Sequence, residues 1–111
     1  MQNQITRQEA IDLTTRFRNI KDKILAPQYQ GTNMLCNSIT FSKTSLLSLL
    51  NQPGCENFRV YFGMNADNTE VDLVLVGVDE KDKDIEGADS IILDDGRRCP
   101  ESCPPSSSLN P

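Results

Sequence analysis

The sequence predicts an α+β fold, in which two helices pack on a small antiparallel sheet of two to three strands and an extended C-terminal tail follows. Three observations support this prediction. Apolar residues recur at helical spacing over residues 7–25, they alternate with a period of two over residues 58–62, and prolines stand at positions 100, 104, 105 and 111. The chain of 111 residues is long enough for one domain. We therefore expect a single domain over residues 1–98 and a Pro/Ser-rich tail over residues 99–111.

The first predicted helix covers residues 7–25. Thr6-Arg7-Gln8-Glu9 fits the capping-box pattern, in which the threonine hydroxyl and the glutamate carboxylate each accept a backbone N–H of the other residue. Pro27 ends the helix. One apolar stripe runs along it at spacings of three and four, formed by Ala10, Leu13, Phe17, Ile20 and Ile24. This stripe needs a surface to cover it, either the protein's own sheet or a partner.

A second, shorter helix is predicted over residues 43–51. Ser42 is a typical N-cap residue, and Gln52-Pro53-Gly54 is a strong stop signal. Four leucines cover a wide arc of this helix: Leu46, Leu47, Leu49 and Leu50. We therefore expect it to be well buried.

The strands follow the second helix. In residues 58–62, Phe58, Val60 and Phe62 point to one face of the chain, while Arg59 and Tyr61 point to the other.

Residues 71–78 are apolar on both faces, which is typical of a central strand covered on two sides. The polar loop with Asn65, Asp67 and Asn68 joins these two strands into an antiparallel hairpin. A short third strand is predicted over residues 91–93.

The composition disfavours most enzyme classes. The chain contains no histidine, so it lacks the commonest general base, the Ser–His and Cys–His nucleophile pairs and imidazole metal ligands. Its six glycines are scattered and form no phosphate-binding loop. We therefore expect no enzymatic activity and no cofactor, with zinc as the one open possibility.

The charge is unevenly distributed along the chain. The net charge is −5, but residues 65–95 hold eleven acidic and two basic side chains, whereas residues 1–26 hold three acidic and five basic ones. An acidic face does not suit nucleic acid, because phosphate contacts need Lys and Arg. Within this region Asp82, Asp84 and Glu86 alternate, and three readings stay open for them: a solvated turn, a cation site and a catalytic carboxylate pair.

Four cysteines remain as chemical candidates: Cys36, Cys55, Cys99 and Cys103. Only the last two are close in sequence, with three residues between them, and two arginines before Cys99 favour its thiolate. Three interpretations stay open: unlinked thiols, a zinc site that uses Cys99 and Cys103 with or without Cys36 and Cys55, and a disulfide within the terminal pair.

The N-terminal residues lack a basic run followed by an apolar segment, and no stretch approaches the ~20 apolar residues that span a bilayer. These patterns predict a cytoplasmic protein that does not insert into membranes.

Residues 41–104 resemble a group of short bacterial proteins with no assigned activity. The resemblance rests on the segments "SKTSLLSLLNQPGC", "FRVYFG", "VDLVLVGVDE" and "DDGRRCPESC". It implies that Gly96, Cys99, Pro100 and Cys103 belong to one terminal motif. It carries over no site residue.

Taken together, these features favour a small, acidic, non-enzymatic interaction or structural subunit that docks on a protein partner or associates with itself. The tail is the predicted contact segment, through Pro104, Pro105 and Leu109, because an extended segment can add to a sheet edge or fill a groove. The alternative is a small cysteine-based zinc-binding or thiol-redox protein built on Cys99 and Cys103.

Overall fold

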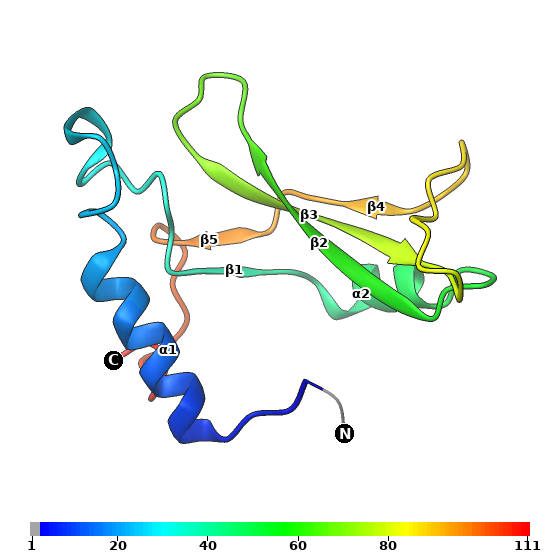
Figure 1. Cartoon of the computed structure of the whole chain (residues 1–111), viewed down its shortest axis with the longest axis horizontal. Coiled ribbons are helices and arrows are strands. Elements are labelled where there is room, and N and C mark those ends of the chain that lie inside the picture. Colours follow the sequence, from blue (N-terminus) through cyan, green and yellow to red (C-terminus); the bar gives the residue numbers. More distant parts are fainter. Residues whose placement is uncertain (1–2) are drawn as a thin grey trace. The chain divides into compact units, whose positions relative to one another are not determined.

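The computed structural model describes residues 3–111, which form two compact units. Residues 3–38 and 98–111 form one of them, here called the terminal unit, and Ile39–Arg97 forms the central unit. The described residues contain two α-helices and two antiparallel sheets, so the predicted α+β class is confirmed (Figure 1). The division differs from the predicted boundary at residue 98, because residues 98–111 belong to the same unit as residues 3–38.

The terminal unit contains α1 (Arg7–Ile20), which starts with the predicted capping box. The Thr6 hydroxyl accepts the N–H of Glu9 at 3.1 Å, and the Glu9 carboxylate accepts the N–H of Thr6 at 3.4 Å. The helix ends at residue 20 and not at residue 25 as predicted. Its regular bonding gives way to a tighter turn, in which the N–H of Lys23 donates to the carbonyl of Ile20.

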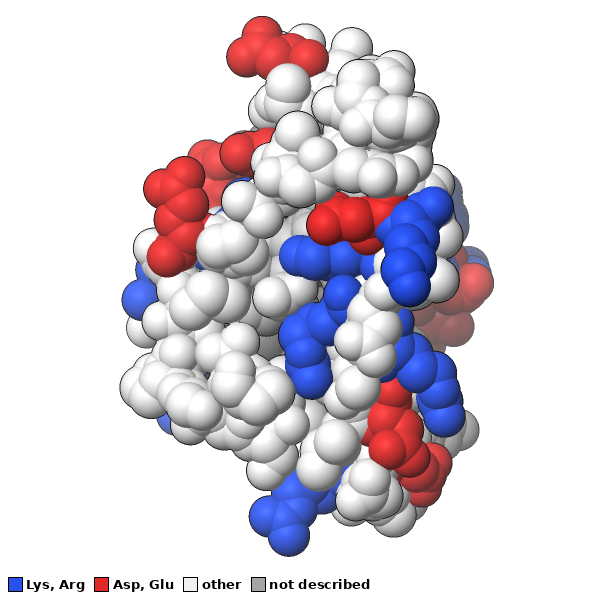
Figure 2. Space-filling model, turned by 90° about the vertical axis from the view of Figure 1, so that its left-hand side faces the viewer, with Lys and Arg blue, Asp and Glu red and all other residues white. Residues whose placement is uncertain are grey.

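No residue of α1 is buried, and Leu13 and Ile20 of the predicted apolar stripe are exposed. α1 therefore packs loosely. Figure 2 shows Lys and Arg side chains gathered near the middle of the view, with smaller groups of Asp and Glu around them.

The buried residues of the terminal unit come from its two ends in the sequence. Met34 and Cys99 are buried, and the N–H of Asn37 donates to the carbonyl of Cys99 at 2.7 Å. The guanidinium of Arg98 donates to the carbonyl of Asn33 at 3.0 Å. Residues distant in sequence thus hold this unit together.

The chain passes from one unit to the other in a two-stranded antiparallel sheet, formed by β1 (Ser38–Thr40) and β5 (Arg97–Cys99). A short 3-10 helix, η1 (Pro27–Tyr29), precedes β1. Neither of these two strands was predicted from the sequence.

The central unit is built on a three-stranded antiparallel sheet with the order β2 (Asn57–Met64), β3 (Val71–Val78) and β4 (Ile92–Leu93). The predicted hairpin is confirmed. Its loop is closed by Asn65, whose side-chain oxygen accepts the backbone N–H groups of Thr69 and Glu70.

α2 (Lys43–Leu50) packs on β3 and β4. It begins at the predicted N-cap, where the Ser42 hydroxyl accepts the N–H of Ser45 at 3.0 Å. Leu49 is fully buried, whereas Leu47 is exposed. Gly77 allows the segment after α2 to approach the sheet closely, since a Cβ there would lie 3.0 Å from Cys55 Sγ and Gln52 Nε2.

The core of the central unit lies on both faces of β3, as the apolar run over residues 71–78 predicts. Leu75, Val76 and Val78 are all buried. The apolar face of β2 does not contribute to this core in the same way, because Phe58, Val60 and Phe62 are exposed.

Candidate functional site

The most conspicuous feature of the central unit is an exposed row of apolar side chains along β2. Successive side chains of a strand point to opposite faces, so the even-numbered residues share one face. We call this set the β2 apolar row, and its exposed fractions are 45% for Phe58, 40% for Val60, 82% for Phe62 and 50% for Met64. Such a continuous apolar row in solvent typically marks a contact surface.

The backbone of β2 is open on one side. β2 is the outer strand of its sheet, and β3 is its one sheet neighbour among residues 3–111. Just beyond β2, the N–H of Asn65 donates to the carbonyl of Glu70 at 3.1 Å. Bonded and non-bonded positions alternate along an antiparallel pair. The residues of the β2 apolar row therefore direct their backbone groups away from β3, toward the open edge.

From the sequence, Phe58, Val60 and Phe62 were predicted to share one face, but that face was not identified as a site. A signal was nevertheless present in the element lengths. The eight residues of α2 span about 12 Å, whereas the eight residues of β2 span about 26 Å. One short helix is therefore too small to cover two long strands.

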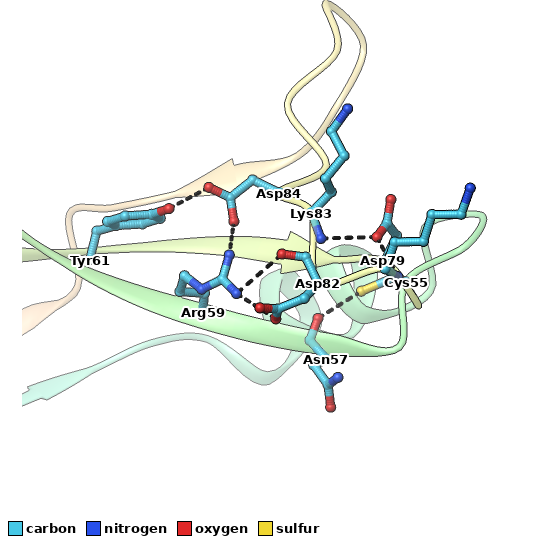
Figure 3. A network of polar contacts seen from close by, with 9 residues as sticks. Cys55, Asn57, Arg59, Tyr61, Asp79, Asp82, Lys83 and Asp84 are labelled. Carbon is cyan, nitrogen blue, oxygen red and sulfur yellow. Dashed lines mark hydrogen bonds and ion pairs between the residues drawn. The ribbon is translucent and has the colours of Figure 1, made fainter.

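The opposite face of β2 carries a polar network (Figure 3). Arg59 and Tyr61 point from β2 toward Asp82 and Asp84, which follow β3. Arg59 forms an ion pair with Asp82 at 2.6 Å and a second one with Asp84. The Tyr61 hydroxyl donates to the other oxygen of Asp84.

These contacts shift the titration of the residues on β2. The hydrogen bond to the Asp84 carboxylate is the main reason that the pKa of Arg59 is raised. The same carboxylate raises the pKa of Tyr61, because the neutral phenol donates to it. The network therefore keeps a cationic guanidinium and a neutral phenol side by side on β2 at neutral pH.

The acidic segment itself forms a turn, which was one of the three readings left open. The Asp79 carboxylate accepts the backbone N–H of Lys81 at 2.8 Å and that of Lys83 at 3.0 Å. These two bonds, the one from Lys83 first, lower the pKa of Asp79. Asp82 and Asp84 point toward Arg59, and Glu86 lies outside this network and is exposed. Within residues 3–111 no three metal-binding side chains come together.

The terminal cysteines are joined. Cys99 and Cys103 form a disulfide, while Cys36 and Cys55 are free and half-buried. Of the three interpretations left open for this pair, the structure shows the disulfide. Zinc binds to thiolates, so a zinc site on Cys99 and Cys103 would first require reduction of this bond.

The predicted contact residues of the tail are exposed to solvent, but hydrogen bonds hold the tail in place. Pro104, Pro105 and Leu109 are exposed, and no helix or strand follows Cys99. The Leu109 carbonyl accepts a hydrogen bond from the Arg18 guanidinium on α1 at 2.8 Å, and the Pro104 carbonyl accepts one from Asn110 at 3.3 Å. The tail therefore folds back on its own unit.

No protein-family model, curated protein or solved structure matches this chain. The resemblance to the bacterial group accordingly stays a prediction. In the stretch from Asn3 to Pro111, no helix has the length and apolar character needed to cross a bilayer.

Proposed function

We propose that this protein is a non-enzymatic interaction or structural subunit that docks on a protein partner through the β2 apolar row and the open edge of β2. The observation that carries this proposal is Phe62, a phenylalanine that is 82% exposed in the middle of an apolar row. Burying apolar surface yields about 25 cal/mol per Å². A partner that covers this row gains that free energy.

The edge adds a second source of recognition. Unpaired N–H and C=O groups on an outer strand are a template for another strand. A partner segment in extended conformation would gain backbone hydrogen bonds along β2 and would place its side chains against the row. The accessible tail residues Pro104, Pro105 and Leu109 remain a second predicted contact.

The test compares two variants as bait in a quantitative pull-down, followed by binding measurements with the purified partner. Phe62→Asp places a charge in the row, and Ile92→Asp places the same charge on β4, where Ile92 is 53% exposed. We expect Phe62→Asp to weaken binding by about tenfold or more, and Ile92→Asp to bind like the unchanged chain. Equal binding by all three proteins would refute the role of the row.

A thiol-redox function is the second candidate, and the Cys99–Cys103 disulfide is the observation that favours it. Cys103 is exposed while Cys99 is buried, so an external thiolate would attack Cys103 Sγ and release Cys99 as a thiolate. A second external thiol would then displace Cys103 from the mixed disulfide. The net reaction reduces Cys99 and Cys103 to two thiols and oxidises the two external thiols to a disulfide.

This candidate is tested by following exchange with a small dithiol. A redox protein should exchange faster than an unfolded peptide with the same CPESC segment. A rate equal to that of the peptide argues against catalysis. Zinc content of the reduced protein, measured alongside, decides whether the reduced pair binds the metal.

A further inference from the structure

We propose that the partner that covers β2 is a second copy of this chain. Two β2 strands would pair antiparallel with Val60 on the two-fold axis, joining the two three-stranded sheets into one of six strands. This inference rests on the proposed function and names its partner.

The row is self-complementary about Val60. In an antiparallel pair centred there, Val60 faces Val60 of the second copy, and Phe58 faces Phe62. The order Phe-Val-Phe of the row reads the same in both directions. A two-fold interface requires this property, since the same patch must match itself.

Charge favours this register over the one that is centred on Arg59. When the strand pair is centred on Val60, Arg59 of one copy lies opposite Tyr61 of the other. The hydroxyl of this Tyr61 donates a hydrogen bond to the Asp84 carboxylate. A guanidinium is attracted both to an aromatic ring and to a nearby carboxylate. If the strand pair were centred one residue earlier, Arg59 would face Arg59 of the second copy. Like charges directly opposite each other are destabilising.

The backbone is arranged for this pairing. The residues of the β2 apolar row direct their N–H and C=O groups to the open edge, as the bond from Asn65 to Glu70 indicates. Centred on Val60, outward-directed residues of one copy meet outward-directed residues of the other. The two strands can therefore form a regular ladder without a bulge.

The row is also large enough to matter for a dimer. If a fully exposed phenylalanine offers about 200 Å², Phe58 and Phe62 of two copies supply about 500 Å² at their observed exposures. That is roughly half of the ~1,000 Å² that a specific interface buries. Val60, Met64 and the backbone edge contribute to the remainder.

Sedimentation equilibrium of the full chain, from micromolar to near-millimolar concentration, tests the proposal. We expect a monomer–dimer equilibrium whose dissociation constant rises about tenfold or more in Phe62→Asp. Val60→Pro should act similarly, because proline is tolerated on an outer strand but removes the outward N–H on the axis. Ile92→Asp is the matched control and should dimerise like the unchanged chain. Circular dichroism verifies that each variant is folded.

Cysteine crosslinking tests the register. Under a mild oxidant, Val60→Cys should give a covalent dimer, because the axis brings the two positions together. Phe62→Cys should not, because it faces residue 58 of the second copy; the unchanged chain controls for Cys36 and Cys55. Crosslinking through Phe62→Cys alone would overturn the register.

The outcomes separate this inference from the proposed function. A monomer at every concentration overturns the dimer, yet the proposed function stands if Phe62→Asp abolishes binding to a different purified partner. A dimer that Phe62→Asp and Val60→Pro leave intact overturns the β2 interface. A monomer with no partner that depends on Phe62 overturns both.

Discussion

Asp79 shows how one carboxylate organises the acidic segment. Its two backbone hydrogen bonds fix the turn from which Asp82 and Asp84 reach Arg59 on the neighbouring strand. The net effect is that an acidic turn and a basic strand residue hold each other in place. Charge runs of this kind are easily taken for solvated loops when only the sequence is considered.

The lowered pKa of Asp79 predicts a pH dependence of stability. A carboxyl whose pKa is lower in the folded state stabilises the fold above the ordinary carboxyl range, near pH 4, and this contribution is lost as the pH falls through the folded pKa. Asp79→Asn should therefore be less stable than the unchanged chain at neutral pH, and the difference should shrink in acid. Urea unfolding at several pH values measures it. A difference that is constant with pH would contradict the prediction.

At the residue level, the sequence indicated which cysteines are close but not their state. Three readings of Cys99 and Cys103 were open because pairing depends on how the backbone brings the two residues together. The exposure of the β2 apolar row was not predicted for a related reason. Alternation reveals that Phe58, Val60 and Phe62 share a face, but it does not reveal whether anything covers that face.

Among the elements, those with local signals were predicted best. The caps at Thr6 and Ser42, the alternation in β2 and the continuous apolar run in β3 located both helices and the hairpin. β1 and β5 were missed because they are three residues each and pair across more than half of the chain. Pairing at such a distance leaves no periodic signature in a short window.

α2 provides a matched test of packing within one helix. Leu49 is fully buried, whereas Leu47 is exposed two residues earlier. Leu49→Ala should lower the free energy of unfolding by about 2–5 kcal/mol, because it removes buried methyl groups and leaves a cavity.

The same substitution at Leu47 should change the free energy of unfolding by no more than about 0.5 kcal/mol. Denaturant unfolding of both variants measures the two effects. Equal losses at the two positions would mean that α2 does not present Leu49 to the core.

At the scale of the whole molecule, the Cys99–Cys103 disulfide lies in the unit made from both ends of the described chain. Structural disulfides are rare in the cytoplasm. The predicted cytoplasmic location therefore stays a prediction. The non-enzymatic role likewise stays a proposal.

Reduction of this bond should affect the two units differently. Cys99 is buried in the terminal unit, and its carbonyl accepts the N–H of Asn37. We expect the reduced protein to exchange amide hydrogens faster in residues 98–111 and 30–38, with little change in β2 and β3. Hydrogen exchange followed by mass spectrometry compares the two states, and alkylated Cys36 and Cys55 serve as a control for the other thiols. Equal acceleration in both units would contradict this expectation.

The central unit is one unbroken stretch of chain set between the two parts of the terminal unit, and this arrangement has a consequence for synthesis. A ribosome releases residues from the N-terminus onward, and compact units generally fold as they emerge. All of Ile39–Arg97 leaves the ribosome before residues 98–111 do. Residues 3–38 cannot meet Cys99 until it has left the ribosome as well. During that interval the nascent chain presents a finished sheet with β2 at its edge, next to an N-terminal segment that has not yet found its partner.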